Sequence, residues 1–289
     1  MGGLTVIYSV DGNTLNNAYD ISANLLSQAY DINGNELLEN RLKVMTFNTQ
    51  DFSGINSQQA MLNAILNTYD ADIIGFQEFC RNGVVPTVAS NALINYPYLQ
   101  LTNHVNYNAV ASKFALSDWT IADYETQDPY DVDTRHETRT YMRGYFALGG
   151  KRIALFNTHL CVTNATPRYA QMAELFALAE QEEYCIITGD FNSNTKPLTT
   201  ETDDYIYQYK PFVDAGYNLA NNSPVAGFTN THSSETSVAN LSALTSALDS
   251  IIVSGNIDIV SVTFDPTKLS YQNGQKFDHI PIIAELTIN

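Results

Sequence analysis

Polar side chains that can bind a metal ion or move a proton recur beside the apolar segments of this sequence. Each such segment is typical of a buried β-strand, and a polar residue directly follows or precedes it. A single polar residue at a strand end is ordinary turn chemistry. Six such positions indicate a common site, because a layered sheet structure gathers its strand ends along one rim. The positions are Asn48, Glu78, His159, Asp190 with Asn192, Asp249, and Asp278 with His279.

The oxygen-bearing members of this set suit a hard divalent cation. Glu78 and Asn48 can supply oxygen ligands of the kind that Mg²⁺ prefers, and Asp278 is a further candidate ligand. Mn²⁺ and Ca²⁺ take similar ligands and are the alternatives. Zinc is disfavoured, because no two His or Cys residues have the spacing of a zinc site. We therefore expect a magnesium-type site.

The remaining members suit the hydrolysis of a phosphodiester bond. His279 can accept the proton of a nucleophilic water if a carboxylate orients its ring, and Asp249 is the best candidate for that carboxylate. His159 and Asn192, together with the cation, can stabilise the charge that builds on the phosphoryl oxygens.

The net charge of the chain constrains the kind of substrate-binding surface that it can have. The chain of 289 residues has 14 Lys and Arg against 31 Asp and Glu, a net charge of −17. This argues against a broad electrostatic DNA-binding face, although a metal and a few local cations are enough to handle one phosphate. The sequence shows neither a transmembrane segment nor a signal peptide, and its three cysteines provide no disulfide framework. We expect a secreted or particle-associated location rather than a cytoplasmic one.

Periodicity predicts an α/β protein. Apolar runs predict strands at 42–47, 72–76, 108–112, 152–157, 184–188, 250–254 and 280–286, and helical spacing predicts a helix that begins near Asn56. A second helix is expected to have Thr166 as its cap and Pro167 at its first position. Residues 196–247 are rich in Asn, Ser and Thr and are expected to form long loops. Strands and helices alternate only partly, which favours a layered sandwich with mixed sheets.

The first forty residues contain a separate repeat. Units that begin at Tyr8, Tyr19 and Tyr30 recur at an offset of 11 residues, each with an aromatic residue, a turn-forming centre and a leucine. Each unit predicts a strand, a tight turn and a second strand. We expect residues 1–40 to be a β-repeat segment and residues 41–289 to be the main domain. The segment is either an attachment or oligomerisation arm or a linker.

The polar blocks, taken in order, resemble the endonuclease/exonuclease/phosphatase superfamily. The resemblance spans about residues 42–288 and leaves the repeats uncovered. Six blocks in the same order make a specific pattern, even though each one is short. The blocks are Met-Thr-Phe-Asn48, Gly-Phe-Gln-Glu78, Phe-Asn-Thr-His159-Leu, Thr-Gly-Asp190-Phe-Asn192, Leu-Asp249-Ser-Ile-Ile-Val-Ser and Asp278-His279-Ile-Pro.

This resemblance implies a four-layered α/β sandwich with two central sheets and the site at one rim. It implies Glu78 as the main metal ligand with Asn48 close by, a His279–Asp249 dyad, and Asp278 near the metal. It further implies that Asp190 and Asn192 position the nucleophile or the phosphate, and that His159 binds a phosphate oxygen or protonates the leaving group. Arg143 and Asn108 match positions where family members often carry substrate-facing polar groups.

Two residues depart from the family pattern. Phe277 stands where a serine usually precedes the final Asp-His, and Ser250 stands where an aromatic residue usually follows the dyad aspartate. Neither change removes a catalytic group, so they bear on the substrate. The leading interpretation is a metal-dependent nuclease with nucleic acid as its partner. The alternatives are a phosphatase or phosphodiesterase acting on lipid or sugar phosphates and a catalytically inactive binding module.

Overall fold

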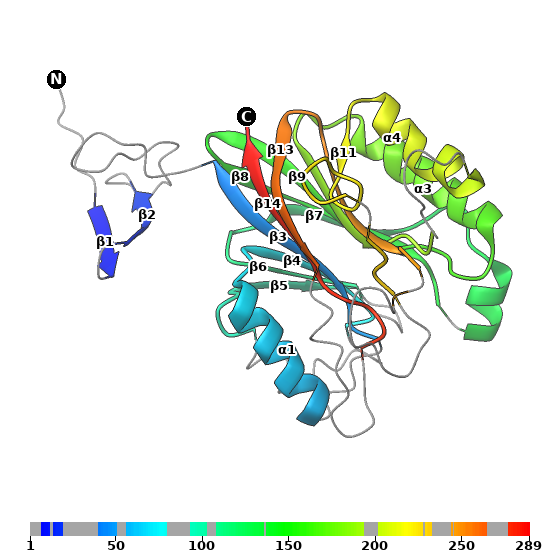
Figure 1. The fold of residues 1–289 in the computed structure, drawn as a ribbon, viewed down its shortest axis with the longest axis horizontal. Helices are drawn as coiled ribbons and strands as arrows, with labels where there is room; N and C mark the ends of the chain where they lie inside the picture. The colour runs from blue at the N-terminus through cyan, green and yellow to red at the C-terminus, as the bar shows by residue number, and fades with distance from the viewer. Residues whose placement is uncertain are drawn as a thin grey trace.

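The computed structural model covers the main domain and part of the N-terminal segment. It describes residues 7–11, 14–19, 40–50, 56–79, 93–102, 108–135, 137–193, 202–227, 229–232, 244, 246–264 and 277–289. Two six-stranded sheets form the centre of the structure (Figure 1). Both are mixed, with mostly antiparallel neighbours and one parallel pair in each sheet.

The first sheet has the strand order β13-β14-β3-β4-β6-β5. Its strands are β3 (Arg41–Asn48), β4 (Ile73–Gln77), β5 (Tyr98–Leu101), β6 (Ala109–Ser112), β13 (Ile257–Phe264) and β14 (Ile282–Ile288). The second sheet has the order β11-β12-β10-β9-β8-β7. Its strands are β7 (Ser117–Asp123), β8 (Thr140–Leu148), β9 (Lys151–His159), β10 (Cys185–Asp190), β11 (Asn218–Leu219) and β12 (Asp249–Val253).

Helices cover the outer faces of the two sheets, which gives four layers (Figure 1). Helix α1 (Asn56–Tyr69) packs Leu62 and Ile65 against the first sheet. Helix α3 (Ala165–Ala179) packs Met172 and Leu175 against the second sheet. The π-helix η2 (Tyr205–Tyr209) and helix α4 (Lys210–Asp214) contribute side chains to the α3 layer. A further π-helix, η1 (Asp131–Arg135), precedes β8.

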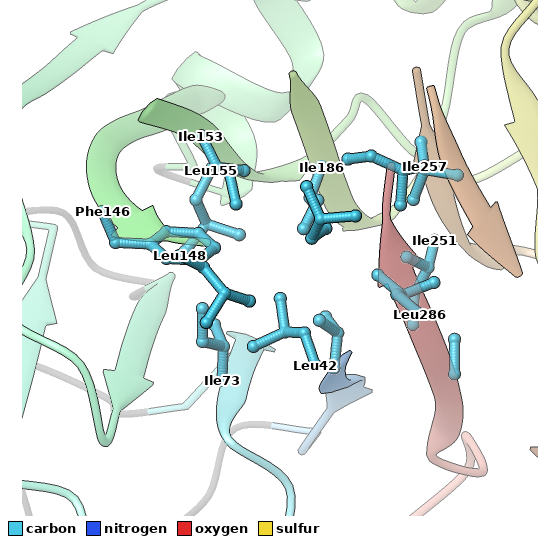
Figure 2. Packing of buried hydrophobic residues seen from close by; sticks show 14 of the residues in the cluster. Leu42, Ile73, Phe146, Leu148, Ile153, Leu155, Ile186, Ile251, Ile257 and Leu286 are labelled. Atoms are coloured by element: carbon cyan, nitrogen blue, oxygen red, sulfur yellow. The ribbon is translucent and has the colours of Figure 1, made fainter. Parts of the chain in front are cut away.

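The inner faces of the sheets meet in an apolar core. Figure 2 shows Ile73 from the first sheet and Leu155 and Ile186 from the second among the side chains that fill this layer. Each such buried side chain contributes about 1.5–3 kcal/mol by leaving water. Strand β9 is buried on both faces, since Leu155 faces the inner core and Phe156 faces the α3 layer. This double burial explains why the strands have continuous apolar runs.

The predicted elements are present, with two corrections. The seven predicted strands correspond to β3, β4, β6, β9, β10, β12 and β14, and the first predicted helix is α1. The cap of α3 is Asn164, not Thr166, because the Asn164 side chain accepts from the Thr166 backbone N–H at 3.2 Å, and Pro167 is therefore the third residue of the helix instead of the first. The stretch 196–247 is not only loop, because it contains η2, α4 and β11.

The N-terminal segment forms a hairpin within its described residues. Strands β1 (Ile7–Asp11) and β2 (Thr14–Tyr19) pair antiparallel and lie apart from the two large sheets (Figure 1). They correspond to the first repeat unit and the residues leading to the second, while the third unit lies outside the described residues. No helix among the described residues is long and apolar enough to cross a membrane.

Candidate active site

The strand ends meet at one edge of the sandwich because of the pairing registers. In the first sheet β3 and β4 run parallel, with Asn48 opposite Gln77. In the second sheet β9 and β10 run parallel, with His159 opposite Asp190, and β12 places Asp249 on the other side of Asp190. The carboxyl ends of both parallel pairs lie at the same edge, since Asn48 of the first sheet donates to Asp190 of the second.

Asn48 joins the two sheets at this edge. Its Nδ2 atom donates to Oδ2 of Asp190 at 2.8 Å and to Oε1 of Glu78 at 3.3 Å. Its Oδ1 atom accepts from the backbone N–H of Gln50 at 2.9 Å. Asn48 and Asp190 are both about 1% exposed. The predicted convergence of Asn48, Glu78 and Asp190 is thus present in the structure.

A histidine–aspartate pair stands beside Asp190. Nδ1 of His279 lies 2.8 Å from Oδ2 of Asp249, and both residues are buried. Nε2 of His279 lies 3.6 Å from Oδ2 of Asp190 and 3.9 Å from Oδ1 of Asp278. A proton on Nδ1 would be held by Asp249, which leaves Nε2 as the ring atom that faces the other carboxylates.

The second histidine is held by Asn192. Nδ2 of Asn192 lies 2.9 Å from Nε2 of His159 and donates to the Leu160 carbonyl at 3.0 Å. Nε2 of His159 is also 3.6 Å from Oδ2 of Asp190. Glu78 and Asn192 have positive φ angles of 52° and 48°. This backbone region is uncommon for residues other than glycine, and such conformations concentrate at functional sites.

We call these residues the rim cluster, and the sequence predicted all of them. They lie on or next to six strands, namely β3, β4, β9, β10, β12 and β14. The members are Asn48, Glu78, His159, Asp190, Asn192, Asp249, Asp278 and His279.

The rim cluster shifts the pKa values of two members. Burial raises the pKa of the Asp190 carboxyl to about 6, and the charge of Asp249 adds to the increase against opposing contacts from His279, Asn48 and Asn192. Burial lowers the pKa of His279, but the carboxylates of Asp249 and Asp190 outweigh this and raise it well above its ordinary value. These surroundings favour added positive charge, as a proton or as a bound cation.

The cluster has the donor chemistry for a divalent cation. The Oδ1 atom of Asp278 is buried and has no hydrogen-bond partner among the described residues. Two overlapping groups keep their potential ligand atoms within 4.8 Å: Asp190, Asp249 and His279, and His232, Asp278 and His279. Carboxylate oxygens dominate the rim, as a hard cation requires. Glu78 belongs to neither group, but its Oε1 atom contacts the same Asn48 Nδ2 that donates to Asp190 and lies 3.9 Å from Nδ1 of His159.

The two residues expected to face the substrate are placed differently. Asn108 is buried just before β6, and its Nδ2 donates weakly to the Thr140 carbonyl at 3.4 Å. This places it at the same edge as the rim cluster, because Ala109 pairs with Phe76 two residues before Glu78. Arg143 is not brought to the cluster. Its Nη1 lies 3.8 Å from Glu182 beyond the end of α3.

The sequence analysis missed two neighbours of the dyad. Thr231 donates to Oδ2 of Asp249 at 2.6 Å. His232 is half-buried, and its ring centroid lies 4.7 Å from that of His279. The sequence contains one signal that could have pointed to these residues. The tripeptide Asn-Thr-His, which ends in the site residue His159 at positions 157–159, occurs again at positions 230–232.

A second polar layer lies directly beneath the rim cluster. Oδ1 of Asn157 accepts from Nε2 of Gln77 at 2.7 Å and from Oγ1 of Thr188 at 3.0 Å. Its Nδ2 donates to the carbonyls of Phe76 and Ala109. Gly75 leaves room for these contacts, since a Cβ there would lie 2.0 Å from Oγ1 of Thr188. Because Asn157 is fully satisfied and buried, it fixes β4 and β6 against β9 and β10.

The departures from the family pattern are both buried. Phe277 is 1% exposed and packs edge-on against Phe47, with ring centroids 4.9 Å apart. Ser250 is 3% exposed on β12. Phe277 therefore extends the core beneath Asp278 and His279.

Comparison with known proteins agrees with this fold. A sequence model of the endonuclease/exonuclease/phosphatase family matches residues 45–271. The chain therefore belongs to this family of phosphoester hydrolases. A search of curated proteins gives no significant match.

Solved structures of similar fold include an endonuclease/exonuclease/phosphatase from Bacteroides vulgatus, with 16% identity, a TM-score of 0.65, and coverage of 86% of this chain and 99% of that one. TDP2 from D. rerio, complexed with a single-strand DNA product, has 14% identity, a TM-score of 0.63, and coverage of 85% and 98%. A mannosyl-6-phosphatase from Bacteroides thetaiotaomicron has 17% identity, a TM-score of 0.61, and coverage of 86% and 99%. At these identities the likeness concerns the fold.

Proposed function

We propose that the chain hydrolyses a phosphodiester bond with the help of a divalent cation, and that nucleic acid is the leading substrate class. The observation that carries the proposal is the rim cluster, in which Asn48 links carboxylates from both sheets beside the His279–Asp249 pair. Family membership supports the reaction class.

The residues divide into three roles. Glu78, Asn48 and Asp278 would hold the cation, for which Mg²⁺ is the leading choice and Mn²⁺ or Ca²⁺ the alternatives. When bound, such a cation supplies Lewis-acid stabilisation of the phosphoryl oxygens. His279 accepts the proton of the attacking water at Nε2, and Asp249 holds Nδ1 and stabilises the protonated ring.

The remaining members face the phosphate. Asp190 and Asn192 orient the water or the phosphate, since the Asn192 backbone N–H fixes Oδ1 of Asp190 at 2.9 Å. His159 binds a phosphate oxygen or protonates the leaving group, and Asn192 holds its Nε2 at 2.9 Å. Asn108 lies at the same edge as the rim cluster, where we assign it a contact with the substrate. Arg143 is left out of this assignment because it pairs with Glu182.

A phosphatase or phosphodiesterase acting on a sugar or lipid phosphate is the second candidate. The net charge of −17 favours a substrate with few negative charges over a long polyanion. A mannosyl-6-phosphatase shares the fold, as does TDP2 with its DNA product. The two candidates differ in whether the substrate is a nucleic acid or a lipid or sugar phosphate.

A substrate panel separates the candidates. Plasmid DNA, single-stranded DNA, RNA, sphingomyelin, inositol phosphates and mannose 6-phosphate would each be incubated with the full chain in Mg²⁺ or Mn²⁺. His279→Ala, prepared in the same way, reports contaminating activity. Cleavage of DNA or RNA by the wild type, but not by His279→Ala, supports the proposal. Cleavage of sphingomyelin, or release of phosphate only from monoesters, supports the second candidate, and no cleavage of any substrate rejects both.

The N-terminal repeats and the location of the protein are separate proposals. We propose that residues 1–40 form an attachment or oligomerisation arm on a catalytic domain of residues 41–289, since the hairpin β1–β2 lies apart from the sheets. An arm of this kind suits a secreted or particle-associated enzyme. Size-exclusion chromatography of the full and shortened chains tests the oligomerisation role.

A further inference from the structure

Thr231 is a buried residue that touches the catalytic dyad from outside the six predicted blocks. Its side chain is fully buried. Its Oγ1 donates to Oδ2 of Asp249 at 2.6 Å, the same oxygen that lies 2.8 Å from Nδ1 of His279. We propose that Thr231 is a positioning residue, which acts through Asp249 to hold the His279 ring. This inference rests on the function proposed above.

The direction of the hydroxyl bond is fixed by its other contacts. A threonine hydroxyl has one proton to donate and two lone pairs that accept. The backbone N–H groups of Leu248 and Asp249 donate to Oγ1 at 3.1 and 3.2 Å. With both lone pairs occupied, the proton points at the Asp249 carboxylate. Thr231 is thus a dedicated donor to the dyad.

The carboxylate depends on this donor. Oδ2 of Asp249 faces Thr231 and His279, while Oδ1 has no hydrogen-bond partner among the described residues. Without the hydroxyl, His279 is the only remaining hydrogen-bond partner of Oδ2 among the described residues. A single contact does not fix the plane of the carboxylate, which can then rotate about its Cβ–Cγ bond. The ring of His279 would then lose the partner that sets its tautomer.

The backbone of Thr231 connects the two halves of the dyad. Its N–H donates to the Ser246 carbonyl at 2.8 Å, and its carbonyl accepts from the N–H of Ile280 at 2.9 Å. Residue 231 therefore lies between the segment that leads into Asp249 and the segment that follows His279. One side-chain hydrogen bond and two backbone hydrogen bonds of Thr231 therefore hold Asp249 and His279 in a fixed position relative to each other.

The test uses substitutions of nearly equal volume. Thr231→Val removes the hydroxyl, and Thr231→Ser keeps it. We expect Thr231→Val to lower kcat by about 10- to 100-fold, the range for losing a group that orients a functional side chain, with KM almost unchanged. Thr231→Ser should restore most of kcat.

Ser254→Ala is the matched control. Ser254 follows the other end of β12, where its buried Oγ accepts from the Cys185 N–H at 3.0 Å and donates to Asn256. Ser254→Ala removes a buried hydroxyl comparable to that of Thr231 but should leave kcat unchanged. In the Asp249→Asn background, Thr231→Val should add little further loss, since both changes act through one carboxylate. An unchanged kcat in folded Thr231→Val, or fully additive losses, would overturn the inference.

A spectroscopic arm separates this inference from the proposed function. The chain has 5 histidines, so the His279 imidazole can be assigned by its disappearance in His279→Ala. In the wild type we expect an Nδ1–H proton signal shifted downfield by the Asp249 bond. Thr231→Val should shift or broaden this signal, whereas Ser254→Ala should not. An unchanged signal would reject the role of Thr231 even if no substrate were cleaved.

Discussion

Two groups of buried acidic side chains in this chain handle their charge in different ways. The first, which we call the Arg139 cluster, consists of Asp128, Asp131, Glu137, Arg139 and Cys161. Arg139 is 3% exposed and donates to Asp131 at 3.2 Å and to Glu137 at 2.7 Å. The thiol of Cys161, whose pKa burial raises to about 12, donates to Asp128. This cluster carries its own cation.

The rim cluster carries no such cation within the described residues. No described Lys or Arg forms an ion pair with Asp190, Asp249 or Asp278, whose charged contacts are with histidines. Amides from Asn48 and Asn192 complete the contacts of Asp190. Both clusters could hold a metal by geometry alone. Arg139 neutralises the first cluster, whereas the carboxylates of the rim cluster have no Lys or Arg partner among the described residues. We therefore infer that the Arg139 cluster is structural and propose the rim cluster as the cation site.

Of the changes that test the difference between the two clusters, removal of divalent cations should have the largest effect on turnover. We expect excess EDTA to abolish turnover, because the carboxylates of the rim cluster need an added positive charge to act on a phosphate. Mg²⁺ or Mn²⁺ should restore it, as measured with the substrate cleaved in the panel. Thermal unfolding in EDTA serves as a control for an intact fold. Undiminished turnover in excess EDTA would contradict the metal assignment.

Replacing the general base should have the next largest effect. His279→Ala is expected to lower kcat by about 10²–10⁴-fold, while cation binding, followed by calorimetry, persists. Asp249→Asn should also be impaired, because an amide cannot stabilise the imidazolium. His279 acts as a base only when neutral, so kcat should fall as pH decreases below its pKa in the complex. His279→Ala should lose this acidic limb.

The competing assignment makes Asp190 the base and His279 a phosphate contact. The pH profiles of two variants distinguish the assignments. If the acidic limb of kcat survives in His279→Ala and disappears in Asp190→Asn, Asp190 is the base. That result would change the roles within the rim cluster and leave its composition unchanged.

Breaking the Arg139 cluster should affect stability and leave chemistry intact. Arg139→Met leaves two buried carboxylates without their cation, which costs about 3–5 kcal/mol in the free energy of unfolding. We expect a lower midpoint in urea and an unchanged kcat per folded molecule. Lys210→Met breaks an exposed pair with Asp214 and should cost less than about 1 kcal/mol. A selective loss of kcat in folded Arg139→Met would show that the Arg139 cluster takes part in the reaction.

The rim cluster could be predicted from the sequence because strand-end geometry is local. Once β3, β4, β9 and β10 are recognised as buried strands, polar residues at their carboxyl ends must meet if the strands run parallel. The run that ends at Asp190 shows this, since it is apolar from Cys185 to Ile187 and ends in Thr-Gly-Asp. Short blocks of this type carry enough information to identify the family as well.

Contacts that depend on distant segments could not be predicted. Thr231 and His232 lie in a stretch of polar residues without helical or strand periodicity, so nothing local places them beside Asp249 and His279. Arg143 shows the opposite error. Its substrate-facing role was inferred from family resemblance, but in the structure its Nη1 lies 3.8 Å from Glu182, 39 residues further along the chain. The ion-pair partner of a long arginine side chain depends on residues that are distant in the sequence.

Removing the N-terminal segment should have the smallest effect. No member of the rim cluster lies before Asn48, and β1 pairs only with β2 among the strands of the structure. The cut should fall before residue 40, because the Asn40 carbonyl accepts from the N–H of Ile288 at 2.7 Å at the end of β14. A chain that begins at Asn40 should keep kcat and KM within about twofold of the full chain, as expected for surface changes away from the site.

The shortened chain also tests where the domain begins. If it folds, as judged by circular dichroism, but cleaves nothing that the full chain cleaves, the repeats belong to the catalytic unit. Reduced solubility with normal kcat would instead indicate that the repeats cover an apolar edge. A chain beginning at Lys43 is the matched control. It removes Asn40, Arg41 and Leu42, and Leu42 is a buried core residue on β3, so it should be less stable than the chain that begins at Asn40.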